Sequence, residues 1–151
     1  MQTPHRWFGA GHSTAPDSAK AGAEAAASAI GGRTSALVFV FCSHQSDLPA
    51  MLRAVRHQAG PDATIIGCTG FGEVSNDGAG VGGVAVAALG GEGFTVRAHV
   101  SHIRDVGHRQ AGAAAAGAMA GITRPHSALV LICDGLSGDP HEVVRGAYSA
   151  L

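Results

Sequence analysis

The stretch Ala63-Thr-Ile-Ile-Gly-Cys-Thr-Gly-Phe-Gly-Glu-Val-Ser-Asn-Asp-Gly78 decides the fold, because a short apolar strand runs directly into a polar loop rich in glycine. Residues 63–67 contain two adjacent isoleucines and no charge, which is typical of a strand covered on both faces. The following loop brings a thiol, a hydroxyl and a carboxylate within six residues, at Cys68, Thr69 and Glu73. Its glycines permit positive φ and a close approach of the backbone to a ligand, and Asn76-Asp77-Gly78 predicts a turn.

Apolar runs and helical patterns alternate on both sides of this stretch. The sequence predicts strands at 6–10, 36–42, 63–67, 81–89, 94–101 and 127–133. It predicts helices from Pro16 to the pair Gly31-Gly32, at 46–58, at 108–119, and from Asp139-Pro140 to the end. Thr14 or Asp17 can cap the first helix. Residues 90–93 predict a hairpin that joins the strands at 81–89 and 94–101.

This order of elements indicates an α/β fold, with a mixed and mostly buried β-sheet and flanking helices in the order β-α-β-α-β-β-β-α-β-α. The length of 151 residues predicts a single domain over 1–151. The last helix ends at Leu151 without a stop signal, so we expect the domain to be incomplete at its C-terminus.

Composition excludes several classes of function. The formal net charge is −1 and the charges are scattered, which argues against nucleic acid or an anionic membrane surface as a partner. Mean hydropathy is +0.18, but no apolar run reaches the roughly 20 residues that cross a bilayer. The N-terminal residues show no secretory signal, so we expect a cytoplasmic protein. The three cysteines are far apart and predict reduced thiols, and no histidine or cysteine spacing indicates a metal site.

The three cysteines share one context, since each ends an apolar strand and precedes a small polar or acidic residue. The pairs are Cys42-Ser43, Cys68-Thr69 and Cys133-Asp134. If these strands are parallel neighbours, their carboxyl ends open at one edge of the sheet, where α/β folds bind ligands. Alternatively, each cysteine is only a small buried residue of the core.

Two groups of residues are candidates for holding a small ligand at that edge. The loop predicted at Gly9-Ala-Gly-His-Ser13 offers backbone N–H groups next to a helix start, and Gly11, His12 and Ser13 are its candidate contacts. Glu73 or Asp134 can bind an ammonium group. Ser43, Cys68, Thr69 and Gly70 complete the predicted site. Alternatively, the glycines only make turns and Glu73 only accepts backbone N–H bonds within its own loop.

Four segments resemble the N-terminal part of the FIST domain, a sensory module of bacterial signal-transduction proteins. They are Gly9-Ala-Gly-His-Ser13, Val38-Phe-Val-Phe-Cys-Ser43, Gly67-Cys-Thr-Gly-Phe-Gly-Glu73 and Leu129-Val-Leu-Ile-Cys-Asp-Gly-Leu136. The resemblance implies a domain that binds small ligands such as amino acids or related metabolites. It also implies a signalling partner, such as a histidine kinase or a cyclic-dinucleotide enzyme acting in trans. The family has a second, C-terminal part, which we expect to be lacking in this sequence.

Two other functions stay open at this point. We expect no cofactor, yet some FIST proteins are similar to haem-based nitric oxide sensors, and His12 is the candidate for the axial ligand. We expect no catalytic residue, but a thiol enzyme is an alternative, with Cys68 as the nucleophile and the N–H groups of Thr69 and Gly70 as oxyanion donors.

Overall fold

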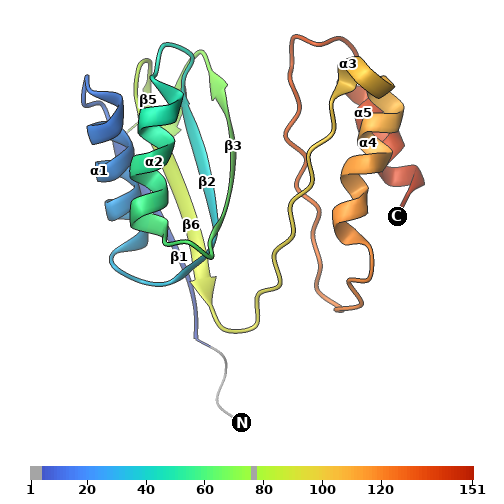
Figure 1. The fold of residues 1–151 in the computed structure, drawn as a ribbon, viewed down its shortest axis with the longest axis horizontal. Coiled ribbons are helices and arrows are strands. Elements are labelled where there is room, and N and C mark those ends of the chain that lie inside the picture. The colour runs from blue at the N-terminus through green and yellow to red at the C-terminus, as the bar shows by residue number, and fades with distance from the viewer. Residues whose placement is uncertain (1–4, 76–77) are drawn as a thin grey trace. The chain divides into compact units, whose positions relative to one another are not determined.

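The structure of the chain is a computed structural model that describes residues 5–75 and 78–151. It forms two compact units, Met1–Val96 and Arg97–Leu151, and each is described by itself. The first unit is an α/β layer of a sheet and two helices (Figure 1). Its elements are β1 (Arg6–Ser13), α1 (Ser18–Ile30), β2 (Ser35–Ser43), α2 (Leu48–Ala59), β3 (Thr64–Gly70), β4 (Glu73–Ser75), β5 (Gly78–Gly80) and β6 (Val84–Gly91).

The four long strands form a mixed sheet in the order β1-β6-β2-β3. Strands β2 and β3 are parallel, whereas β6 is antiparallel to both β1 and β2. Because β6 runs the opposite way, its first residues lie at the same end of the sheet as the last residues of the other three strands. The predicted α/β class with a mixed sheet is therefore confirmed.

Helices α1 and α2 pack together and cover one face of this sheet (Figure 1). The core joins alanines of α1, Met51 and Val55 of α2, and the alternate residues Val38 and Val40 of β2. Alternation along β2 leaves Phe41 exposed. Residues 63–67 were predicted to be covered on both faces, but Ile65 and Ile66 of β3 are only half-buried in this unit. On α2, Met51 and Val55 are buried against the sheet, whereas Leu48 and Leu52 are exposed.

Side-chain caps fix the helix ends as predicted. Asp17 accepts a hydrogen bond from the backbone N–H of Lys20 at the start of α1, and Gly31 ends that helix in the left-handed conformation. Asp47 caps α2 in the same way. Among the described residues, no helix combines the length and apolar character needed to cross a membrane.

The second unit contains α3 (Ile103–Val106), α4 (His108–Ala116), the 3-10 turn η1 (Gly117–Met119) and α5 (Pro140–Ser149). Helices α4 and α5 pack closely at two glycines, Gly112 and Gly146, where a Cβ atom would meet a backbone oxygen of the other helix. Asp139 caps α5, as its Asp-Pro start predicts.

Two predicted strands do not form. Residues 94–101 alternate like a strand, but both edges of β6 are already paired, with β1 and with β2, so the expected hairpin has no free edge there. Residues 127–133 also have no strand partner within the part of the chain that the structure describes. An apolar segment needs a neighbouring strand for its backbone hydrogen bonds, and a pattern in the sequence does not supply one. The turn predicted at Asn76-Asp77-Gly78 lies partly outside the described residues, since 76 and 77 are not among them.

Candidate functional site

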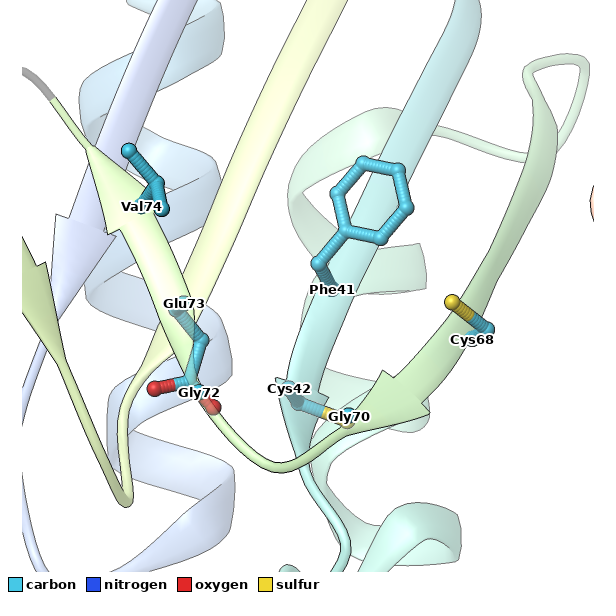
Figure 2. Close-up of a pocket in the computed structure, with 7 residues that line it drawn as sticks. All are labelled: Phe41, Cys42, Cys68, Gly70, Gly72, Glu73 and Val74. Carbon is cyan, nitrogen blue, oxygen red and sulfur yellow. The ribbon is translucent and has the colours of Figure 1, made fainter. Parts of the chain in front are cut away.

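A cavity of about 280 Å³ lies where β2, β3 and β4 meet in the first unit (Figure 2). The residues that line it are Phe41, Cys42, Cys68, Gly70, Gly72, Glu73 and Val74. Two are thiols, two are glycines, and one is a carboxylate. Ligand pockets in proteins usually measure about 300–1,000 Å³, so this one lies just below that range and has room only for a small group.

Glu73 is placed by the short β4–β5 hairpin. Glu73 pairs with Gly80, and the two-residue alternation of β4 turns Glu73 inward while Val74 faces outward. The side chain of Glu73 is 3% exposed, whereas that of Val74 is 80% exposed. The hairpin lies close to the loop before it, since a Cβ at Gly72 would be 2.8 Å from the backbone oxygen of Gly80. A side chain at position 72 would therefore displace the strand that carries Glu73.

One oxygen of the Glu73 carboxylate has a partner and the other has none. Oε2 accepts a hydrogen bond of 3.0 Å from the backbone N–H of Gly83. Oε1 is buried and has no hydrogen-bond partner among the described residues. A buried carboxylate oxygen without a donor is costly, which is why such groups in native proteins call for an explanation.

Gly83 is where several predicted site residues converge. Its carbonyl accepts a hydrogen bond from the backbone N–H of Ser43. A Cβ at Gly83 would lie 2.7 Å from His12 Nε2, 3.0 Å from the carbonyl oxygen of Ser13, and 3.5 Å from Glu73 Oε2. The structure therefore brings His12, Ser13, Ser43 and Glu73 around one glycine, which the sequence did not single out. The pair Gly82-Gly83 immediately before an apolar strand was the available signal.

The sheet places Ser13, Ser43 and Thr69 at one edge, as predicted. Ser13 pairs with Val84, Cys42 pairs with both Val84 and Thr69, and Ser43 pairs with Gly70. The hydroxyls of the two serines each make a hydrogen bond within the protein. Ser13 donates to Glu24 at 2.7 Å, and Ser43 accepts from the N–H of Gln45. Their roles as ligand contacts stay predictions.

The segment Gly9–Ser13 is not the loop that we predicted. It belongs to β1 and pairs with β6 along its whole length, up to Ser13 and Val84. Gly9 and Gly11 serve packing instead, because a Cβ at either position would overlap a backbone oxygen of α1. An anion site built from consecutive free N–H groups is therefore not available in this strand.

The polar end of β3 also differs from the prediction. The strand continues to Gly70, so Cys68, Thr69 and Gly70 are strand residues and not loop residues. Cys68 pairs with Phe41 on the neighbouring strand and is exposed, and both line the cavity. Figure 2 shows them on the adjacent strands β3 and β2.

Cys42 is a buried neutral thiol. Burial raises the pKa of Cys42 above its ordinary value of 9.0, and the nearby charges of Glu73 and Cys68 raise it further, while a hydrogen bond from Ser46 opposes them. A thiol with a raised pKa is a poor nucleophile near neutral pH, because the thiolate is the reactive form.

Asp134 belongs to the second unit. Its carboxylate accepts a hydrogen bond of 2.9 Å from the backbone N–H of Leu136, and its carbonyl accepts one from Ser137. This is the local turn that Asp commonly makes, and Cys133 beside it is exposed.

Comparison with protein-family models finds one family, the FIST N domain, whose model matches residues 36–151. No curated protein matches the chain. The matched range contains every residue that lines the cavity, whereas β1 and α1 precede it.

Proposed function

This chain belongs to the FIST N domain family, and we propose that it is a sensory domain of a bacterial signal-transduction system that binds a small ligand in the cavity between β2, β3 and β4. The observation that carries the proposal is the buried carboxylate of Glu73 in that cavity, with one oxygen unpartnered among the described residues. Amino acids and related metabolites are the first ligands to test. The signal would pass to a partner in trans, such as a histidine kinase or a cyclic-dinucleotide enzyme.

Cys68 offers a direct test of where a ligand binds. It lines the cavity and is exposed, while Cys133 is exposed in the other unit. A ligand in the cavity should slow the alkylation of Cys68 by iodoacetamide and leave the rate at Cys133 unchanged. The two rates are read in one sample by mass spectrometry of the peptides, so Cys133 is an internal control. A ligand that raises the melting temperature of the protein without slowing the alkylation of Cys68 would bind outside this cavity.

Haem does not fit this cavity. None of the seven lining residues is a histidine, and a carboxylate lines its wall, which is unfavourable for the anionic propionates of haem. His12 lies against Gly83 and is not among the lining residues. A haem site on another histidine stays a proposal, and a Soret band after reconstitution that is lost on replacing a single histidine would establish it.

A further inference from the structure

We propose that two copies of this chain pair edge to edge through β3, so that their sheets join into one continuous sheet across a two-fold axis. The inference goes beyond the proposed function, because it concerns a protein partner and does not depend on which ligand the cavity binds. The unpaired edge of β3, the uncharged sequence of that strand and an exposed leucine on α2 support it.

Strand β3 has a free edge. It is the last strand in the order β1-β6-β2-β3, and among the described residues no strand pairs with its outer side. The N–H of His44 donates a hydrogen bond to the carbonyl oxygen of Gly70, so the backbone groups of Gly70 point toward β2. Because these groups alternate in direction along a strand, those of Ile65, Gly67 and Thr69 point away from β2. Each of these three residues therefore offers a donor and an acceptor to a partner strand.

The sequence of β3 contains nothing that blocks this edge. Proteins usually protect an edge strand with a charged side chain, a proline or a β-bulge. Residues 64–70 contain no charged residue and no proline, and the pairing of β2 with β3 runs without a register shift. The strand at the opposite edge, β1, contains Arg6 and His12. Of the two edges, that of β3 is therefore the one suited to a neighbouring strand.

An antiparallel second copy matches the free edge in full. In antiparallel pairing, two residues directly opposite each other can exchange both of their backbone hydrogen bonds. Pairing centred on Gly67 places this residue opposite Gly67 of the second copy and Ile65 opposite Thr69, so every outward-facing residue of β3 finds an outward-facing partner. Ile66 then lies opposite Cys68, and no like charges meet across the axis.

An exposed leucine of α2 lies on the side of this edge. Met51 marks the side of α2 that faces α1, since a Cβ at Gly22 would be 2.9 Å from Met51 Cγ. Arg56 marks the side that faces β3, since it donates a hydrogen bond to the carbonyl oxygen of Ala63, the residue before the strand. Leu52 is 41% exposed and lies about 100° around the helix from Met51 but only about 40° from Arg56. A two-fold axis perpendicular to the sheet puts both copies of α2 on one face, so the pairing would cover this leucine.

Hydrogen exchange measured by NMR tests the pairing on the whole chain. We expect the amides of Ile65, Gly67 and Thr69 to exchange about 10-fold more slowly when about nine-tenths of the chains are paired, since only the unpaired tenth exchanges. The amides of Ile66 and Cys68 point toward β2 and serve as internal controls, so their exchange should not depend on protein concentration. Sedimentation velocity on the same samples gives the fraction of dimer.

Two lysine variants test the contribution of α2. Leu52→Lys brings like charges together on one face of the joined sheet, so it should raise the dissociation constant of the dimer at least about 10-fold. His57→Lys is the matched control, because it adds the same side chain at an exposed position about 140° around the helix from Leu52. Its dissociation constant should equal that of the wild type. The melting temperature of each variant verifies that it folds.

A disulfide tests the register. In a Cys133→Ser background, Ile66→Cys places a thiol opposite Cys68 of the second copy, at a Cα spacing of about 4.5 Å that a disulfide can span. Oxidation with copper–phenanthroline should then give covalent dimers on a non-reducing gel. Leu37→Cys in the same background is the control, because it is half-buried on β2 and away from the edge, and it should give far fewer.

Several outcomes would overturn the proposal. One is a chain that stays monomeric up to about 1 mM. Another is protection of the amides of Ile65, Gly67 and Thr69 that does not change with concentration, which would assign a different strand to this edge. A dimer that Leu52→Lys does not weaken and that Ile66→Cys does not link would use another surface. None of these measurements involves a ligand, so their failure would leave the proposed function of the cavity unaffected.

Discussion

The backbone N–H of Gly83 donates a 3.0 Å hydrogen bond to the buried carboxylate of Glu73. Glu73 is the first residue of β4, and Gly83 lies ten positions later, immediately before β6. This bond ties the β4–β5 hairpin to the start of β6, at the edge where β1 and β2 end. The contact orients the one charged group in the cavity. If a ligand binds in this cavity, as we propose, the same pair of residues should affect both stability and binding.

Removing the Glu73 side chain should destabilise the protein more than neutralising it. Glu73→Ala leaves the N–H of Gly83 without its acceptor in a buried place, which costs about 1–3 kcal/mol. Glu73→Gln retains an acceptor and removes a charge that lacks a partner on one oxygen, so its free energy of unfolding should stay within about 1 kcal/mol of the wild type. Urea unfolding of both variants measures the difference. Equal losses in the two would mean that the hydrogen bond contributes little.

A methyl group at position 83 should disturb the site. In Gly83→Ala the new Cβ would lie 2.7 Å from His12 Nε2 and 3.0 Å from the backbone oxygen of Ser13. We expect a loss of about 1–3 kcal/mol from overpacking. The control is Gly80→Ala, where a Cβ would meet nothing within 4 Å and where φ is not positive. A Gly83→Ala protein as stable as Gly80→Ala would contradict the packing around Gly83.

The raised pKa of Cys42 predicts how stability depends on alkaline pH. Below the ordinary thiol pKa of 9.0 the thiol is protonated in both the folded and the unfolded chain, so it contributes no pH dependence. Above that value the unfolded chain ionises first, because burial and Glu73 keep the folded thiol neutral, and the free energy of unfolding should fall. In Cys42→Ala the decline above pH 9 should be shallower, even though the variant is less stable throughout. Denaturant unfolding between pH 8 and pH 10.5 tests this, and parallel curves for the two proteins would refute it.

The packing of α4 on α5 should depend on Gly112. A Cβ there would lie 1.9 Å from the backbone oxygen of Val143, so Gly112→Ala must push the helices apart. We expect a loss of about 1–3 kcal/mol or more, since backbone and not a flexible side chain must move. Gly117→Ala is the matched control in the same unit, because a Cβ there would meet nothing within 4 Å and its φ is −57°. Hydrogen exchange of the amides of α4 and α5 reports the effect on this unit. Similar protection in both variants would count against close helix contact.

The α/β class, the strands β2 and β3, and the helix ends could be predicted from the amino-acid sequence, because these features depend on local signals. The cap residues Asp17, Asp47 and Asp139 bond to backbone groups only two or three positions away, and a continuous apolar run predicts a central strand without knowledge of its neighbours. The prediction that Ser13, Ser43 and Thr69 share one end of the sheet depended on the strands being parallel, and the strand directions bear it out for these three residues.

Which strands are neighbours became clear only from the folded chain. The insertion of β6 between β1 and β2 turned the predicted loop at Gly9–Ser13 into a strand and left residues 94–101 without an edge. It also brought Gly83 to Glu73, His12 and Ser43. Strands pair through backbone N–H and C=O groups of segments that are far apart in the chain. These groups are the same in every residue except proline, which lacks the N–H. No local pattern distinguishes them, so the arrangement of the site had to be read from the folded chain.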